Sequence, residues 1–248
     1  MKIQLHPKHL PLAMLFAGIL GAILRWILYA TGVDAKNLLI SNHWANILLT
    51  VLTLASLGAV ICGAWNLQQA AKYSFNFPAS LPGGIGAALA GLGMLSSAIF
   101  SLGQGGDTLW LISGVFSLFS AAAFGLWGFC RWKGNRPTVL AGTIICICLM
   151  LYTVCRYRLW SAAPQVQNYL FSLLATVCVM LSCYQSTAFA IGLGDRRLHS
   201  FFHLSAVYFC LVSLPHCDNP FLYITLAAWL LTDLCNLTPM PKANRRMP

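Results

Sequence analysis

The chain has 248 residues, of which 58% are hydrophobic and only 8% are charged. About a quarter of the residues in a soluble domain carry charge, because its surface must be solvated, so this composition excludes an ordinary soluble protein. The 5 acidic residues are all aspartates, which leaves few carboxylates for an enzyme that needs several of them.

The formal net charge is +10, a value also found in nucleic-acid-binding proteins, where clustered Lys and Arg displace counterions from phosphates. Here the basic residues lie in short groups between apolar runs, which is typical of the loops of membrane proteins. We therefore expect a lipid bilayer around the chain and no nucleic-acid partner.

Long apolar runs predict membrane-spanning helices, since a helix needs about 20 mainly apolar residues to cross a bilayer. The first run resembles a signal peptide but continues past Arg25 without a convincing cleavage site, so it is interpreted as a retained span. The predicted spans are 10–31, 44–65, 83–103, 108–130, 138–156, 166–191, 199–214 and 220–237. The seventh is short and ends at Pro215, so seven spans are the alternative. The sequence thus predicts an all-α polytopic transmembrane bundle, a single domain over 1–248 without an extramembrane domain.

The distribution of Lys and Arg indicates the orientation, because cytoplasmic loops carry an excess of both. With eight spans and the N-terminus inside, the inner side holds Lys2, Lys8, Lys72, Arg131, Lys133, Arg136, Arg196, Arg197, Lys242, Arg245 and Arg246. The outer side holds only Arg25, Lys36, Arg156 and Arg158. This asymmetry favours eight spans with both termini in the cytoplasm.

Small residues allow helices to pack closely in lipid. They are frequent in the span 83–103, and in the span 108–130 they recur every four residues as Ser117, Ala121 and Gly125. We expect both helices to be packed at the centre of the bundle, with flexible hinges as the functional alternative.

Three arginines lie at or near the outer boundary, where few cations are expected: Arg25, Arg156 and Arg158. The planar guanidinium group suits carboxylate and phosphate ligands, which predicts an outward-facing pocket for a small anionic ligand. Trp160 and Gln167 are candidate walls of that pocket. Alternatively, the arginines extend to the interface or pair with outer aspartates and fix the helix ends.

Two further polar residues lie inside predicted spans. Gln185 belongs to a polar stretch of the sixth span, where interhelical hydrogen bonds are the ordinary role and a substrate path is the alternative. Asp233 is the only carboxylate in the last apolar run, and such a residue commonly couples transport to protons or cations. A pair with Arg196, Arg197 or a C-terminal arginine is the alternative for Asp233.

His199 and His203 are four residues apart and therefore share one helical face, as two ligands of a metal or haem do. The sequence places no third ligand beside them, and the zinc-protease pattern H-E-x-x-H is absent because Ser200 follows His199. The 10 cysteines include no C-x-x-C pair and lie mostly in apolar runs, where a free thiol behaves as a small hydrophobe. We therefore expect no metal and no cofactor.

A set of motifs extends over most of the chain: Arg25, 77–82 (FPASLP), 156–160 (RYRLW), Pro164, Gln167, Tyr169 and 192–197 (GLGDRR). Together they resemble a group of bacterial multi-pass membrane proteins to which no activity is attached. The resemblance implies a bacterial plasma (inner) membrane and no mechanism.

Three classes of function remain. A small-molecule transporter, or the membrane-embedded substrate-binding subunit of one, is preferred because the outer arginines offer a binding site. A non-catalytic structural, assembly or sensory component, acting through a protein partner or as a homo-oligomer, is the alternative. An intramembrane or lipid-modifying enzyme is the least favoured, because carboxylates are scarce and no nucleophile motif is present.

Overall fold

The computed structural model describes residues 10–33, 39–40, 42–67, 69–105, 107–161 and 169–237. Over these residues the chain forms the helices α1 Leu10–Thr31, α2 Trp44–Trp65, α3 Tyr73–Asn76, α4 Leu81–Gln104, α5 Thr108–Lys133, α6 Val139–Trp160, α7 Leu170–Ala190, α8 Arg196–Ser213 and α9 Pro220–Cys235. A short 3-10 turn, Leu214–His216, continues α8. Apart from an isolated bridge between Val33 and Leu39, the described segments contain no β-structure. The predicted all-α fold is confirmed.

Seven of the described helices are long and apolar enough to cross a membrane, and α9 is a shorter apolar helix. Large apolar side chains are exposed on α1 and α2, among them Phe16 (64%) and Leu54 (66%), and a surface of this kind is expected to contact lipid. The chain is an integral membrane protein built as a helical bundle.

The sequence-based prediction and the structure disagree about the identity of the short helix. The predicted seventh span becomes a segment of 21 residues, Arg196–His216, because α8 begins earlier and the 3-10 turn extends it. The short helix is instead α9, with 16 residues. At 1.5 Å per residue it is about 24 Å long, somewhat less than the hydrocarbon thickness of about 30 Å.

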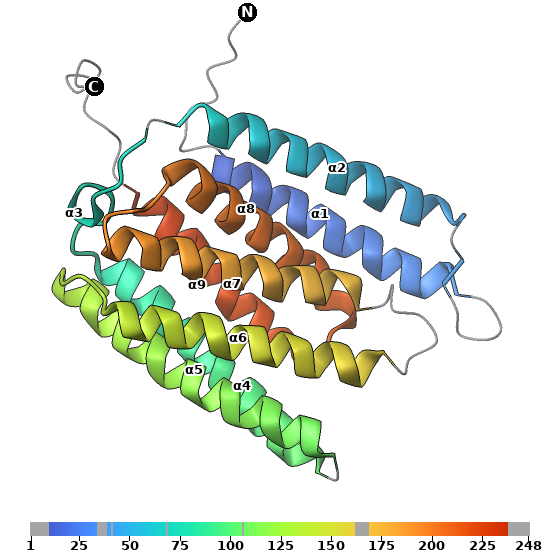
Figure 1. The fold of residues 1–248 in the computed structure, drawn as a ribbon. Coiled ribbons are helices and arrows are strands. Elements are labelled where there is room, and N and C mark those ends of the chain that lie inside the picture. The colour runs from blue at the N-terminus through green and yellow to red at the C-terminus, as the bar shows by residue number, and fades with distance from the viewer. Residues whose placement is uncertain are drawn as a thin grey trace, which may run out of the picture.

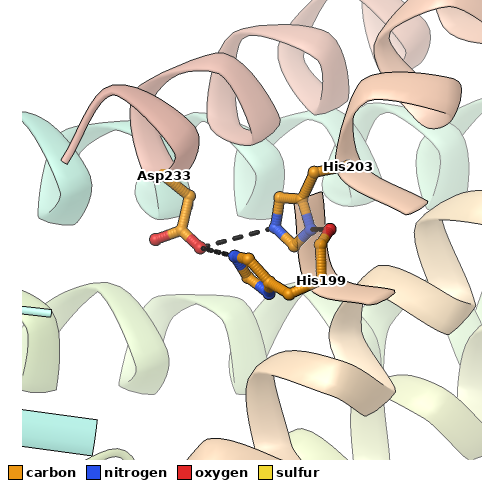
Figure 2. Close-up of side chains that lie close together, drawn as sticks. All are labelled: His199, His203 and Asp233. Atoms are coloured by element: carbon orange, nitrogen blue, oxygen red, sulfur yellow. Dashed lines mark hydrogen bonds and ion pairs between the residues drawn. The ribbon is translucent and has the colours of Figure 1, made fainter. Parts of the chain in front are cut away.

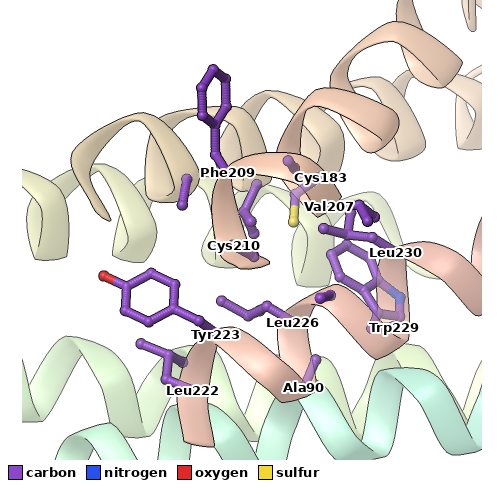
Figure 3. Close-up of a cluster of buried hydrophobic side chains, with 14 of the residues drawn as sticks. Ala90, Cys183, Val207, Phe209, Cys210, Leu222, Tyr223, Leu226, Trp229 and Leu230 are labelled. Carbon is purple, nitrogen blue, oxygen red and sulfur yellow. The ribbon is translucent and has the colours of Figure 1, made fainter. Parts of the chain in front are cut away.

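The axes of the long helices are roughly aligned with one another (Figure 1). At the centre, α8 packs against α1, α2, α7 and α9, and α9 packs against α4. The helices α4, α5, α6 and α7 continue around the bundle as successive neighbours. Among the seven long helices α8 is the most buried and α2 the least. Figure 3 shows the core between α8 and α9, where Cys210 and Phe209 lie near Tyr223, Leu226 and Trp229.

Polar residues fix where several helices begin, because their side chains accept hydrogen bonds from the first backbone N–H groups of the helix. Ser80 caps α4, Asp107 caps α5, Asp195 caps α8 and Asn219 caps α9. At the other end of α5, Gly134 adopts the left-handed conformation, with φ of 70°, which favours glycine. These local signals set the positions of the helix ends.

Glycine allows α4 and α5 to touch at the backbone. A Cβ atom on Gly128 would lie 2.8 Å from the Gly84 carbonyl oxygen, and one on Gly84 would lie 3.0 Å from that of Gly128. The prediction of central packing holds for α4, which lies between α5 and α9. For the predicted stripe on α5 it holds in part. Ser117 is buried and the Ala121 carbonyl oxygen would lie 3.1 Å from a Cβ on Gly91 of α4, whereas Gly125 is exposed with nothing within 4 Å of its Cβ position.

We call the end of the bundle that contains α3 the α3 end. There α2, α5, α7 and α9 finish, and α4, α6 and α8 begin. The opposite end holds the last turns of α1 and α6 and the start of α9 (Figure 1).

Candidate functional site

The α3 end contains four buried ionisable side chains from three helices, which we call the Asp233 cluster. Arg131 comes from α5, His199 and His203 from α8, and Asp233 from α9. Their exposed fractions are 2%, 0%, 0% and 3%, respectively. Burial of charged groups is costly unless they are paired, so these side chains must satisfy one another.

The two carboxylate oxygens of Asp233 face different partners. Oδ1 accepts a hydrogen bond from Nη2 of Arg131 at 2.6 Å, which makes a buried ion pair. Oδ2 faces both histidines, at 3.4 Å from Nε2 of His203 and 3.6 Å from Nε2 of His199. Figure 2 shows the carboxylate and the two imidazole rings directed toward one another. Arg131 thus holds the carboxylate in place and leaves its second oxygen to the histidines.

The two histidines lie one helical turn apart, with ring centroids separated by 3.8 Å and ring planes tilted by 39°. Nδ1 of His203 lies 2.9 Å from the carbonyl oxygen of His199. Because a carbonyl oxygen only accepts hydrogen bonds, this Nδ1 carries the hydrogen, and in the neutral ring Nε2 keeps a lone pair. Nδ1 of His199 lies 3.5 Å from Oγ of Ser186. Within the described residues neither Nε2 makes a hydrogen bond.

Aromatic rings surround the cluster. The Phe77 ring, which follows α3, lies 4.6 Å from the Arg131 guanidinium and 5.4 Å from the His199 ring. Phe189, at the end of α7, lies 5.4 Å from His199, and Trp229 lies 5.9 Å from His203. The apolar surroundings strengthen every electrostatic interaction among the four side chains, because the local dielectric constant is low.

At the opposite end, Arg156 is buried and makes several contacts within the bundle. Its Nη1 lies 3.2 Å from Oδ2 of Asp218, its Nη2 donates a hydrogen bond to Oγ of Ser101 at 3.3 Å, and its guanidinium lies 4.3 Å from the Trp110 ring. Pairing with an outer aspartate, one of the sequence-based alternatives, is therefore observed for Arg156.

Arg25 is also buried. Its Nη1 donates a hydrogen bond to the carbonyl oxygen of Val212 on α8 at 3.0 Å, and its guanidinium lies 5.1 Å from the Phe171 ring. Its side chain therefore ties α1 to α8 within the bundle.

The other predicted pocket residues are scattered. Trp160 is buried and stacks on Tyr169 at 4.7 Å, with its ring 6.0 Å from the Arg156 guanidinium, whereas Arg158 is exposed. Gln167 lies outside the described residues. Gln185 is buried at 8% but sits in the half of α7 nearest the α3 end. The structure thus brings Arg156 and Trp160 together and separates Gln185 from them.

A cavity of about 290 Å³ lies at the opposite end, between α4 and α5. Ser101 and Trp110 line it, and both also contact Arg156. The charged side chain in its lining is Asp107 rather than an arginine.

Sequence reasoning missed the role of Arg131 and the partner of Asp233. Arg131 was assigned to the basic loop after the fourth span, but α5 continues to Lys133 and buries it. Asp233 pairs with Arg131, not with Arg196 or Arg197. The aromatic residues on either side of Arg131 were the available signal, since they continue the apolar run through it.

The residue types in the cluster are those of a metal site. From the sequence, only His199 and His203 could be named as possible metal ligands. One ring nitrogen of His199, one of His203 and a carboxylate oxygen of Asp233 lie within 4.8 Å of one another, all in buried residues. The third ligand comes from α9 and is brought to the histidines only by packing.

No protein-family model, curated protein sequence or solved structure matches the chain.

Proposed function

We propose that the protein is a cation transporter, or the membrane-embedded cation-binding subunit of one, with the Asp233 cluster as its binding site. The observation that carries the proposal is the arrangement of Asp233, whose Oδ2 faces two buried imidazole nitrogens at 3.4 and 3.6 Å without a hydrogen bond. A carboxylate oxygen and two imidazole lone pairs repel one another unless an imidazole is protonated or a cation lies between them, so this oxygen is a site for a proton or a metal ion. Ionisable residues inside a membrane commonly mark ion pathways.

The buried arginines support a cation rather than an anion as the principal cargo. Arg25 and Arg156 both direct their guanidinium groups at partners within the bundle, so an anion would have to compete with those contacts. Asp233, by contrast, offers one oxygen that Arg131 does not occupy. The role predicted for Asp233 from the sequence, coupling of transport to a cation, then takes the form of direct cation binding by its carboxylate.

We also propose a bacterial inner-membrane location with the α3 end in the cytoplasm. Lys72, Arg131, Lys133, Arg196 and Arg197 belong to helices or connections at the α3 end. The opposite end has fewer basic residues, which is the asymmetry expected when the α3 end faces the cytoplasm.

Uptake of cations into proteoliposomes tests the transport proposal. Purified wild-type protein, Asp233→Asn and Asp107→Asn would be compared with a panel of monovalent and divalent cations. Asp107 is an exposed helix cap, and Asn caps helices about as well as Asp, so this variant is the matched control. Uptake that Asp233→Asn abolishes and Asp107→Asn preserves is expected, and equal uptake by all three proteins would contradict the proposal.

A second candidate is an anionic ligand at the opposite end, near Arg156, Arg158 and Trp160. The observation that favours it is the 290 Å³ cavity, whose lining includes two contacts of Arg156. A thermal-stability screen with anionic metabolites tests it, because a ligand at 100 times its Kd stabilises the native state by about 2.7 kcal/mol. A stabilising ligand whose effect disappears in Arg156→Ala supports this candidate. If no anion stabilises the protein, the arginines have a structural role.

A further inference from the structure

We infer that the cation bound by the Asp233 cluster is a divalent transition metal of the zinc type, coordinated by Nε2 of His199, Nε2 of His203 and Oδ2 of Asp233. The inference rests on the proposed function only in that both use the same cluster. It narrows the cargo from cations in general to metals that bind imidazole.

The two nitrogen–oxygen distances fit a tetrahedral metal. With metal–ligand distances of about 2.0–2.2 Å, two ligands of a tetrahedral zinc site lie about 3.3–3.6 Å apart. Oδ2 of Asp233 lies 3.4 Å from Nε2 of His203 and 3.6 Å from Nε2 of His199. Ligand atoms from all three residues lie within 4.8 Å of one another, so a rotation of the imidazole rings would bring both nitrogens to one ion.

The protonation of the histidines also fits coordination. A metal-bound histidine usually donates its other ring N–H to a carbonyl, carboxylate or water, which fixes the tautomer and the ring orientation. His203 makes this hydrogen bond from Nδ1 to the His199 carbonyl oxygen at 2.9 Å. Oγ of Ser186 lies 3.5 Å from Nδ1 of His199 and offers the corresponding partner. Nε2 of His203 therefore presents its lone pair toward Oδ2 of Asp233, and Nε2 of His199 does the same in the tautomer that donates from Nδ1 to Ser186.

The ligand set selects the class of metal. Imidazole suits zinc, copper, iron and nickel, whereas magnesium and calcium prefer ligand sets made of oxygen. Two nitrogens and one oxygen thus disfavour the alkali and alkaline-earth cations. Three protein ligands leave a fourth coordination position, as in sites that exchange a ligand rather than in closed structural zinc sites, and this suits a metal that is taken up and released.

Arg131 has a definable effect on such a site. Its guanidinium bonds Oδ1 of Asp233 at 2.6 Å, so the carboxylate charge is shared between the arginine and the metal. The arginine positions Asp233 and at the same time weakens metal binding by repulsion. Replacing Arg131 with neutral Gln is therefore expected to raise metal affinity, an effect that a merely structural role of Arg131 would not produce.

Titration of Co²⁺ into the purified full-length protein tests the inference. Tetrahedral Co²⁺ absorbs visible light far more strongly than octahedral Co²⁺, so the spectrum reports coordination as well as binding. We expect one Co²⁺ per chain with a tetrahedral spectrum that stoichiometric Zn²⁺ abolishes. His203→Gln and Asp233→Asn should lower the Co²⁺ affinity by at least about tenfold, whereas His43→Gln, which changes a histidine at the opposite end, should leave it unchanged.

X-ray absorption on the Co²⁺-loaded wild-type protein gives a second measurement that does not depend on the folding of variants. Two imidazole ligands in the scattering shell are expected. A folded wild-type protein that binds no Co²⁺ or Zn²⁺, or binds them without imidazole ligands, overturns the inference. If Asp233-dependent uptake of another cation persists in that case, the proposed function stands and only the identity of the cation is wrong.

Discussion

At the Asp233 cluster, one carboxylate oxygen of Asp233 is held in an ion pair and the other faces two histidines. The Arg131–Asp233 pair is buried on both sides, and the histidines meet only the second carboxylate oxygen. Desolvation offsets much of the attraction within a buried pair, so such a pair is weak evidence for a purely stabilising role. Its retention beside two histidines is better explained by a need for a fixed, charged ligand.

Removal of Asp233 alone should destabilise the protein, because it leaves the buried Arg131 without its carboxylate. We expect Asp233→Ala to lower the free energy of unfolding by about 3–5 kcal/mol, the usual result of breaking a buried pair. The double variant Arg131→Met/Asp233→Leu should recover most of this loss. Unfolding in detergent measures both effects, and the single variants Arg131→Met and Asp233→Leu complete a double-mutant cycle with the double variant. Additive losses would show that the two residues are not coupled.

Arg156 and Arg158 form a natural matched pair, since they lie two residues apart on α6 and differ in burial. Arg156→Ala removes hydrogen bonds to Asp218 and Ser101, and hydrogen bonds to charged groups contribute about 1.5–3 kcal/mol. Arg158 is exposed, so Arg158→Ala should change stability by less than about 0.5 kcal/mol. Thermal unfolding of both variants checks the difference, and equal effects would contradict the assigned contacts.

The positions of the helices could be predicted from the sequence, but which helices become neighbours could not. Apolar length located each span, because hydropathy is a local property of the chain. The predicted boundaries stopped early at Arg131 and Arg156, because an arginine is normally taken as the end of an apolar run. Each is instead buried by a partner from α9 or its connection. Those partners are 102 and 62 residues away, and hydropathy does not record which helices become neighbours.

The α4–α5 contact depends on glycine at specific positions. Gly128→Ala would place a Cβ 2.8 Å from the Gly84 carbonyl oxygen, so the helices must separate, at a cost of about 1–3 kcal/mol. Gly125→Ala lies on the same helix with nothing within 4 Å of the new atom, and the higher helix propensity of Ala should stabilise it by up to about 1 kcal/mol. Unfolding measurements on both variants are the test. A Gly128→Ala protein as stable as Gly125→Ala would exclude the close contact.

For the whole molecule, orientation decides from which compartment the cluster is reached. With the α3 end in the cytoplasm, green fluorescent protein fused after residue 248 should fluoresce. Alkaline phosphatase fused within the α4–α5 connection should be active, because it folds only outside the cytoplasm. The reverse pattern would place the basic residues of the α3 end outside and invert the proposed topology.

In the whole molecule, the proposed cation-binding site is the Asp233 cluster enclosed by α5, α8 and α9. Equilibrium dialysis of the purified protein against Na⁺, K⁺, Mg²⁺ and Zn²⁺, with bound metal counted by mass spectrometry, tests whether a cation binds there. We expect the wild-type protein to retain one cation per chain and Asp233→Asn to retain none, with Asp107→Asn behaving as wild type. A wild-type protein that retains no cation, or an Asp233→Asn variant that retains as much, would contradict the proposal.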